Sequence, residues 1–179
     1  MSKKVLLLHG WGGSNFPHWQ SWLAGEIAKE YGKVSFFSFS DFENPNLDIW
    51  MGELIKELEE FKPDIVICHS LATTLWFHLC NTQEVQSIET LYLVAPPSLT
   101  TYIPELATFF PLSLPQNLYA KEALLIASTN DPYMSEDEAK RLQKKLNIPM
   151  EILENAGHIN GDSGYGEWPW IKEELKKKL

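Results

Sequence analysis

The chain has 179 residues, of which 44% are hydrophobic, and its 15 Lys and Arg against 24 Asp and Glu give a formal net charge of −9. This length predicts a single domain over residues 1–179, which can bury ~70% of the surface that the unfolded chain exposes. The negative charge argues against a nucleic-acid partner, because that affinity depends largely on Lys and Arg bound to phosphate. No apolar run reaches the ~18 residues of a membrane span, and the short run at 5–8 lacks the length of a secretory signal. We therefore expect a cytoplasmic protein without a membrane span.

Short apolar runs alternate with helical patterns from one end of the chain to the other. Six such runs predict strands that are buried on both faces, at residues 5–8, 34–39, 65–68, 91–94, 123–127 and 150–153. Between them, helical spacing joins Trp50 and Leu54, and a capping box opens another helix at Ser135. This alternation predicts an α/β fold, a three-layer α/β/α sandwich with about six parallel strands and right-handed crossovers. The irregular stretch 98–122, which is rich in aromatic residues and proline, predicts a small cap.

All strands of such a sheet end at the same edge, and ligands bind there. The loops after the first, third, fifth and sixth predicted strands are residues 9–13, 69–72, 130–132 and 156–158. They contain Ser70, Asp131 and His158, in the chain order Ser, Asp, His that is typical of the α/β-hydrolase fold. A serine needs a base to become nucleophilic, and the base needs an orienting acid. These three residues are therefore the candidate catalytic triad.

Ser70 lies between a predicted strand and a predicted helix, within residues 68–72. This is the context of a nucleophile elbow, the strained turn whose usual pattern is Gly-x-Ser-x-Gly. Cys68 is bulkier than the glycine usual at its position. The N–H groups of Leu71 and of Trp11, which stands among glycines, are the candidate donors to the oxyanion.

The surrounding residues leave alternatives open. Glu154 and Asp162 flank His158 in sequence and are the alternative acids. Aromatic residues pack in cores more often than in pockets. The candidates for the substrate pocket are nevertheless Trp11, His18, Phe109 and Phe110.

Other residues near the predicted edge favour structural roles. We expect His9 to order the glycine loop through hydrogen bonds and His69 to pack beside the site. The glycines at 10–13 lack the spacing and the lysine of nucleotide-binding loops. There is no His-Glu-x-x-His segment, and Cys68 and Cys80 are not at metal-ligand spacing. We therefore predict no metal and no other cofactor.

Five groups of residues, spread in order over nearly the whole chain, carry a family resemblance. They are His9-Gly10-Trp11-Gly12-Gly13-Ser14 with His18-Trp19-Gln20, His69-Ser70-Leu71-Ala72, Ser128-Thr129-Asn130-Asp131-Pro132-Tyr133, Gly157-His158-Ile159-Asn160, and Ser163-Gly164-Tyr165-Gly166-Glu167-Trp168-Pro169. With them the chain resembles the small serine hydrolases related to retinoblastoma-binding protein 9, a minimal branch of the α/β-hydrolase superfamily. The resemblance implies a six-stranded parallel sheet without a large cap, and a triad at Ser70, Asp131 and His158. It implies a reaction class rather than a substrate.

Together these features predict a serine hydrolase that cleaves a small carboxylic ester, or an amide, through an acyl-enzyme intermediate. The alternative is a protein-interaction module of the same fold with a vestigial triad. No Leu-x-Cys-x-Glu segment supports a pocket-protein partner. An intact triad favours catalysis, because a vestigial one is expected to have lost a member.

Overall fold

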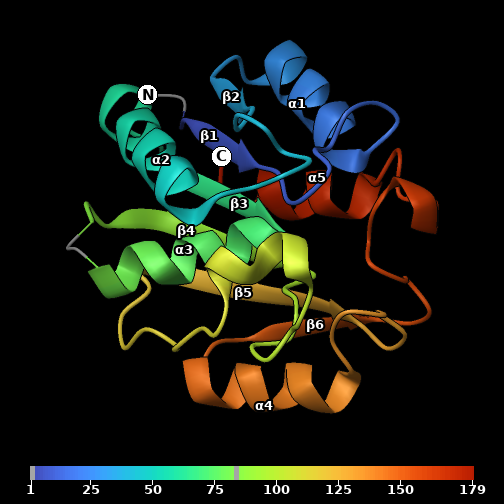
Figure 1. Ribbon diagram of the computed structural model, residues 1–179. Helices are drawn as coiled ribbons and strands as arrows, with labels where there is room; N and C mark the ends of the chain where they lie inside the picture. The colour runs from blue at the N-terminus through green and yellow to red at the C-terminus, as the bar shows by residue number, and fades with distance from the viewer. Residues whose placement is uncertain (1–2, 83–84) are drawn as a thin grey trace.

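A single sheet of parallel strands forms the centre of the computed structural model, which describes residues 3–82 and 85–179 (Figure 1). Within these ranges, six strands pair in the order β2-β1-β3-β4-β5-β6. The strands are β1 Val5–Leu8, β2 Val34–Phe37, β3 Ile65–His69, β4 Ile88–Val94, β5 Ala120–Ser128 and β6 Met150–Leu153. Every neighbouring pair is parallel, which confirms the predicted sheet.

Several strand ends differ from the prediction. β2 stops short of Phe39, because the N–H of Phe39 donates to Nε2 of His9 (2.9 Å). β4 and β5 each begin three residues before the apolar runs that predicted them. The first residues of these two strands include Glu89 and Lys121, whose side chains remain partly or fully exposed. A search for apolar runs misses such residues, because only the backbone joins the sheet there.

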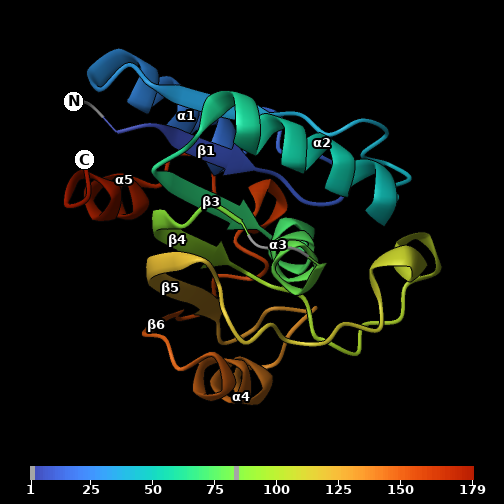
Figure 2. The ribbon, with the colours of Figure 1, turned by 90° about the vertical axis from the view of Figure 1, so that its left-hand side faces the viewer.

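Helices cover both faces of the sheet (Figure 2). They are α1 Trp19–Glu30, α2 Leu47–Phe61, α3 Leu71–Thr82, α4 Glu136–Leu146 and α5 Pro169–Lys176. On one face, α1 and α5 share a core with Val5 and Leu7, and on the other, α2, α3 and α4 share a core with Leu6 and Leu8. Successive residues of β1 thus enter opposite cores, as the pleat of a strand requires. The result is a three-layer α/β/α sandwich, and no helix in the described ranges is long and apolar enough to cross a membrane.

The segment 98–122 packs on the helices of the second face. It contains the short 3-10 helix η1, Pro104–Phe109. The ring of Phe109 is fully buried and lies edge-to-face with Trp50 at 5.6 Å between centroids, and its carbonyl oxygen is 2.8 Å from Nε2 of His78. The segment is therefore fastened to α2 and α3.

The chain changes direction at β1, since β2 pairs on one side of it and β3 on the other. The loops after β1 and β3 consequently diverge at this point, which is where open α/β sheets bind ligands. Gly10 and Ser70 meet there. A Cβ atom on Gly10 would lie 2.8 Å from Cβ of Ser70 and 3.1 Å from the backbone nitrogen of Leu71. Only glycine allows this approach.

Candidate active site

Ser70 occupies a sharp turn between β3 and α3. Its φ of +53° lies in the left-handed region, which costs about 1–3 kcal/mol for a residue with a side chain. The surrounding backbone holds it there, because its N–H donates to the carbonyl of Val94 (2.9 Å) and its own carbonyl accepts from the N–H of Thr73 (2.9 Å). The turn forms with Cys68 in place of the usual glycine, and the thiol is buried in the core. Burial raises the pKa of Cys68 well above its ordinary value.

Ser70, His158 and Asp131 form one chain of hydrogen bonds. Nε2 of His158 lies 2.8 Å from Oγ of Ser70, and Nδ1 lies 2.9 Å and 3.0 Å from the two carboxylate oxygens of Asp131. A carboxylate can only accept, so Nδ1 carries the proton and Nε2 is left to accept the serine hydroxyl. His158 and Asp131 are 7% and 9% exposed. The arrangement can therefore remove a proton from Ser70 in a site largely shielded from water.

Side chains of other loops hold the backbone around His158. Four successive N–H groups have side-chain acceptors: Asn155 donates to Thr129 Oγ1 (2.9 Å), Ala156 to Ser128 Oγ (3.0 Å), Gly157 to Asn130 Oδ1 (2.7 Å) and His158 to Ser163 Oγ (3.1 Å). Nε2 of His69 lies 3.2 Å from the carbonyl oxygen of His158 and donates to it. Three of the four acceptors directly precede Asp131, so one short segment positions both Asp131 and His158.

Gly157 is required by this loop. Its φ is +56°, and a Cβ atom there would collide with the side chain of Ser163. The same serine accepts from His158, so any side chain at 157 would displace a group that holds the base.

Three further histidines surround the elbow. His9 orders the glycine loop as predicted, with Nε2 accepting from Phe39 and Nδ1 donating to the carbonyl of Gly10 (2.8 Å). His69 packs between His18 and His158, with ring centroids 4.9 Å and 5.3 Å away, and burial holds its pKa well below the ordinary value. Burial, and then the neighbouring His158 and His9, lower the pKa of His18 to about 4.

The loop that carries Trp11 approaches Leu71 at the switch point, since a Cβ atom on Gly10 would lie 3.1 Å from the backbone nitrogen of Leu71. The N–H groups of Gly12 and Gly13 already have partners, since Gly12 donates to the carbonyl of Phe42 in the segment after β2 (2.9 Å) and Gly13 donates to the carbonyl of Gly10 (3.2 Å). Within residues 3–82 and 85–179, the N–H groups of Trp11 and Leu71 enter no hydrogen bond. They remain available to an oxygen atom bound next to Ser70.

A cleft of about 400 Å³ opens over Ser70 and His158, lined mainly by residues 11–18 and 160–162. Of the predicted pocket residues, Trp11 and His18 line it. Phe109 does not, because it is buried against Trp50, and Phe110 lines a separate hollow beside Tyr102.

The alternative acids lie apart from the imidazole. Asp162 lines the cleft and is exposed, and Glu154 is exposed at the end of β6. The carboxylate at Nδ1 of His158 is that of Asp131.

The sequence analysis did not single out Tyr133 as a site residue. Its ring lies 4.5 Å from that of His158, edge-to-face, and its N–H donates to Oδ1 of Asp131 (2.9 Å). Its place two residues after the acid, in a turn with proline, is the only signal for it in the sequence.

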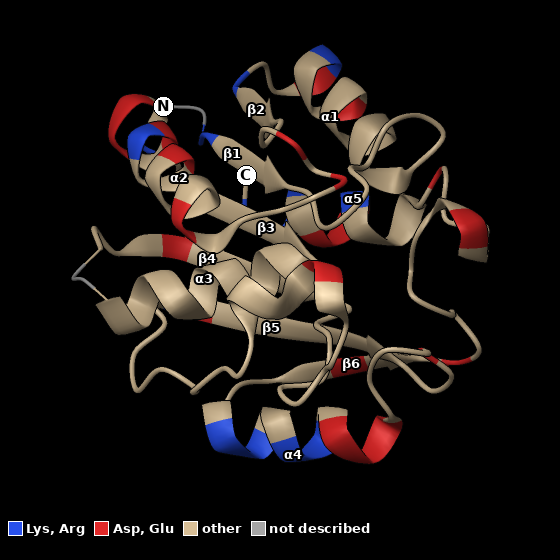
Figure 3. Ribbon diagram, in the orientation of Figure 1, with Lys and Arg blue, Asp and Glu red and all other residues tan. Residues whose placement is uncertain are grey.

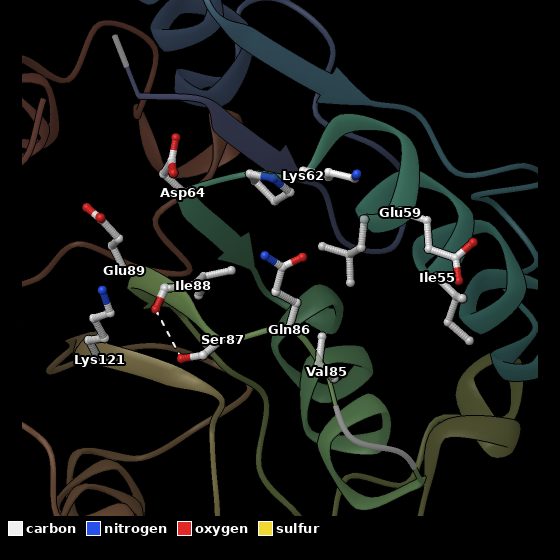
Figure 4. A pocket seen from close by; sticks show the side chains of 12 residues that line it. Ile55, Glu59, Lys62, Asp64, Val85, Gln86, Ser87, Ile88, Glu89 and Lys121 are labelled. Atoms are coloured by element: carbon white, nitrogen blue, oxygen red, sulfur yellow. Dashed lines mark hydrogen bonds between the residues drawn. The ribbon is translucent and has the colours of Figure 1, made fainter. Parts of the chain in front are cut away.

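A second hollow, of about 300 Å³, lies at the opposite edge of the sheet between α2 and the starts of β4 and β5 (Figure 4). Charged side chains of both signs surround it, among them Lys62, Asp64 and Lys121. It contains none of the three candidate triad residues.

The loops at the carboxyl edge carry charge of one sign (Figure 3). Residues 9–18, 38–46, 129–135 and 154–168 include no Lys or Arg. Their charged residues are Asp41, Glu43, Asp131, Glu154, Asp162 and Glu167. Such a field repels anions from the cleft.

Comparison with known proteins places the chain in a family. A family model described as serine hydrolase matches residues 5–177. The chain belongs to this serine hydrolase family. YdeN of Bacillus subtilis (strain 168) is 22% identical over 182 residues, which cover 98% of this chain and 95% of YdeN.

Solved structures show the same fold. The crystal structure of the B. subtilis ydeN gene product matches with a TM-score of 0.84 at 20% identity, over 98% of this chain and 97% of that one. A YdeN-like protein from Pectobacterium atrosepticum matches with a TM-score of 0.74 at 24% identity, over 97% and 89%. An α/β-superfamily protein from Xanthomonas campestris matches with a TM-score of 0.71 at 14% identity, over 99% of each chain. The protein therefore has the α/β-hydrolase fold.

Proposed function

We propose that this serine hydrolase cleaves a small carboxylic ester, or an amide, through an acyl-enzyme intermediate. The observation that carries the proposal is the hydrogen-bonded chain from Oγ of Ser70 through His158 to Asp131, with the serine raised on a left-handed turn. A serine held in this way beside a correctly oriented imidazole is the arrangement that acyl transfer needs.

In the acylation step, Oγ of Ser70 attacks the carbonyl carbon while its proton passes to Nε2 of His158. Asp131 keeps Nδ1 protonated and stabilises the imidazolium that forms. The tetrahedral intermediate then collapses, and the leaving alcohol or amine takes the proton from Nε2. Water attacks the acyl-enzyme with His158 again as the base, which restores Ser70. Every step uses groups of the chain itself and needs no cofactor.

The negative charge on the carbonyl oxygen would be stabilised by the N–H groups of Leu71 and Trp11. Losing one such donor typically costs about 2.7–4 kcal/mol of transition-state stabilisation. Leu71 begins α3, so the positive end of the helix dipole adds to the effect. Gly10 supports the proposal, because its close approach to Ser70 and to the backbone nitrogen of Leu71 brings the residue before Trp11 against the elbow.

A fluorophosphonate probe tests the proposal directly. It should label the protein stoichiometrically at Ser70, and the label should disappear in Ser70→Ala while the circular dichroism spectrum is unchanged. Absence of labelling in folded protein would refute the activated serine and favour the alternative interaction module.

We further propose a cytoplasmic protein from the branch related to retinoblastoma-binding protein 9. The segments that carry that resemblance supply both the elbow and the two loops that hold Asp131 and His158. Two free buried cysteines fit a reducing compartment.

A further inference from the structure

We propose that the cleft selects short-chain esters of hydroxylated alcohols without an anionic group, such as polyols, and that His18 donates a hydrogen bond to a hydroxyl oxygen of that alcohol. The inference rests on the hydrolase activity proposed above and specifies its substrate class.

The first observation is the chemistry of the lining. Sites for hydrocarbon chains are lined predominantly by apolar and aromatic side chains. Among the residues that the structure describes, no Leu, Ile, Val or Met side chain lines this cleft, and its apolar members are Trp11 and Pro17. The two phenylalanines that could have received an acyl chain lie elsewhere, Phe109 in the core and Phe110 in another hollow. A long acyl or alkyl group would therefore find no surface to cover it.

The second observation is a pair of unpaired polar groups in the wall of the cleft. Ser14 and His18 both line it and are only 3% and 6% exposed. Within the described part of the chain, Oγ of Ser14 and Nε2 of His18 have no hydrogen-bond partner. Buried polar side chains nearly always have a partner, so two unpaired ones in a catalytic cleft point to a ligand group.

The hydrogen-bonding role of His18 follows from its place in the fold. It caps α1, and its Nδ1 accepts from the N–H of Gln20 (3.1 Å). The proton of the neutral ring is then on Nε2, so the nitrogen that has no partner is a hydrogen-bond donor. With a pKa of about 4, the ring is uncharged at neutral pH and recognises an acceptor by direction rather than by charge.

The charge of the loops around the cleft narrows the substrate class further. The absence of Lys and Arg from the four loops at this edge disfavours carboxylates and phosphates as the acceptor. A hydroxyl oxygen can accept from Nε2 of His18, and a second hydroxyl can exchange a hydrogen bond with Ser14. A hydroxylated alcohol satisfies both without bringing a charge into the cleft.

Propyl acetate and glycerol monoacetate form a matched pair of test substrates, because both have a three-carbon alcohol and differ by two hydroxyl groups. We expect kcat/KM to be at least tenfold higher for glycerol monoacetate. We also expect 4-nitrophenyl acetate to be cleaved faster than 4-nitrophenyl hexanoate. The variant His18→Asn keeps an acceptor oxygen for the helix cap but loses the Nε2 donor. Its kcat/KM should fall about tenfold more for glycerol monoacetate than for propyl acetate, which is the effect of one neutral hydrogen bond.

Controls separate the possible failures. His78→Asn, on α3 and outside the cleft, should leave the ratio of the two substrates unchanged. Ser14→Ala should lower the same ratio and covers the case in which His18→Asn does not fold. Equal turnover of both acetates by a protein that fluorophosphonate labels at Ser70 would overturn this inference alone. Absence of labelling would overturn the hydrolase proposal and this inference with it.

Discussion

Asn130 offers a sharp test of how the proposed base is positioned. Its Oδ1 accepts from the N–H of Gly157 (2.7 Å) and from the hydroxyl of Ser128 (2.9 Å), which itself accepts from Ala156. Asn130→Ala removes the acceptor next to His158. The N–H of Gly157 is partly accessible to water, so we expect a loss of about 1 kcal/mol, or about 2–4 °C in Tm at this chain length.

The effect on the reaction should be much larger than the effect on stability. A displacement of about 1 Å at a reacting group can reduce the rate by about 10²-fold. We expect kcat with 4-nitrophenyl acetate to fall by that factor while KM changes little, because the cleft wall is untouched. Asn130→Asp keeps an acceptor oxygen and should restore most of kcat.

Thr129→Ala is the matched control. It removes the acceptor of the N–H of Asn155 (2.9 Å). Asn155 belongs to the same series of N–H groups bound by side chains, but it lies three residues before His158. Urea unfolding should show a similar loss of stability, with kcat reduced far less. Equal losses of kcat in the Thr129 and Asn130 variants would mean that these hydrogen bonds stabilise the fold without positioning His158. That result would refute this reasoning.

Four other outcomes follow from the structure. Burial lowers the pKa of His18 from 6.5 to about 4, so the unfolded chain takes up a proton first. The contribution of His18 to stability should be constant above pH ~6.5 and fall by about 3 kcal/mol toward pH 4, as the difference between urea titrations of the wild type and of His18→Asn would show. Gly10→Ala should reduce kcat more than 10²-fold, because the new Cβ atom would lie 2.8 Å from Cβ of Ser70 and displace it. Steady-state assays of the folded variant would show this loss. Asp131→Asn should lower kcat by up to ~10⁴-fold in the same ester assay, and unchanged turnover would mean another acid. Phe109→Ala should cost about 3–5 kcal/mol in urea unfolding and leave the preference for acyl length unaltered.

The fold could be predicted because the strands are buried on both faces. Residues of β1 and β3 enter cores on both sides, so they form apolar runs that the sequence displays directly. The starts of β4 and β5 could not be predicted in the same way, since Glu89 and Lys121 belong to them through their backbones alone. The rule that ligands bind at the carboxyl edge predicts that Ser70, Asp131 and His158 lie close together.

The pocket could not be predicted from residue type. Phe109 and Trp11 are both aromatic residues near strand ends, yet one is fully buried and the other is 37% exposed in the cleft. The difference arises from tertiary packing, because Trp50 of α2 covers Phe109. Nε2 of His18 is left unpaired because the other ring nitrogen, Nδ1, accepts the hydrogen bond of the helix cap. A sequence pattern does not predict which of the two nitrogens takes that role.

The distance between strands explains why the loop after β6 is held by so many side chains. β3 and β6 are separated by β4 and β5, so their ends lie three strand spacings apart, or about 14 Å. His158 nevertheless reaches Ser70 at 2.8 Å, so its loop must turn back across the ends of β5 and β4. On that path its N–H groups have no neighbouring strand to pair with, and the buried N–H of Ala156 would be costly to leave unpaired. The polar run Ser128-Thr129-Asn130, at the end of β5 and directly below this path, supplies the acceptors instead. The run is thus a consequence of placing His158 and Ser70 after strands that are not neighbours.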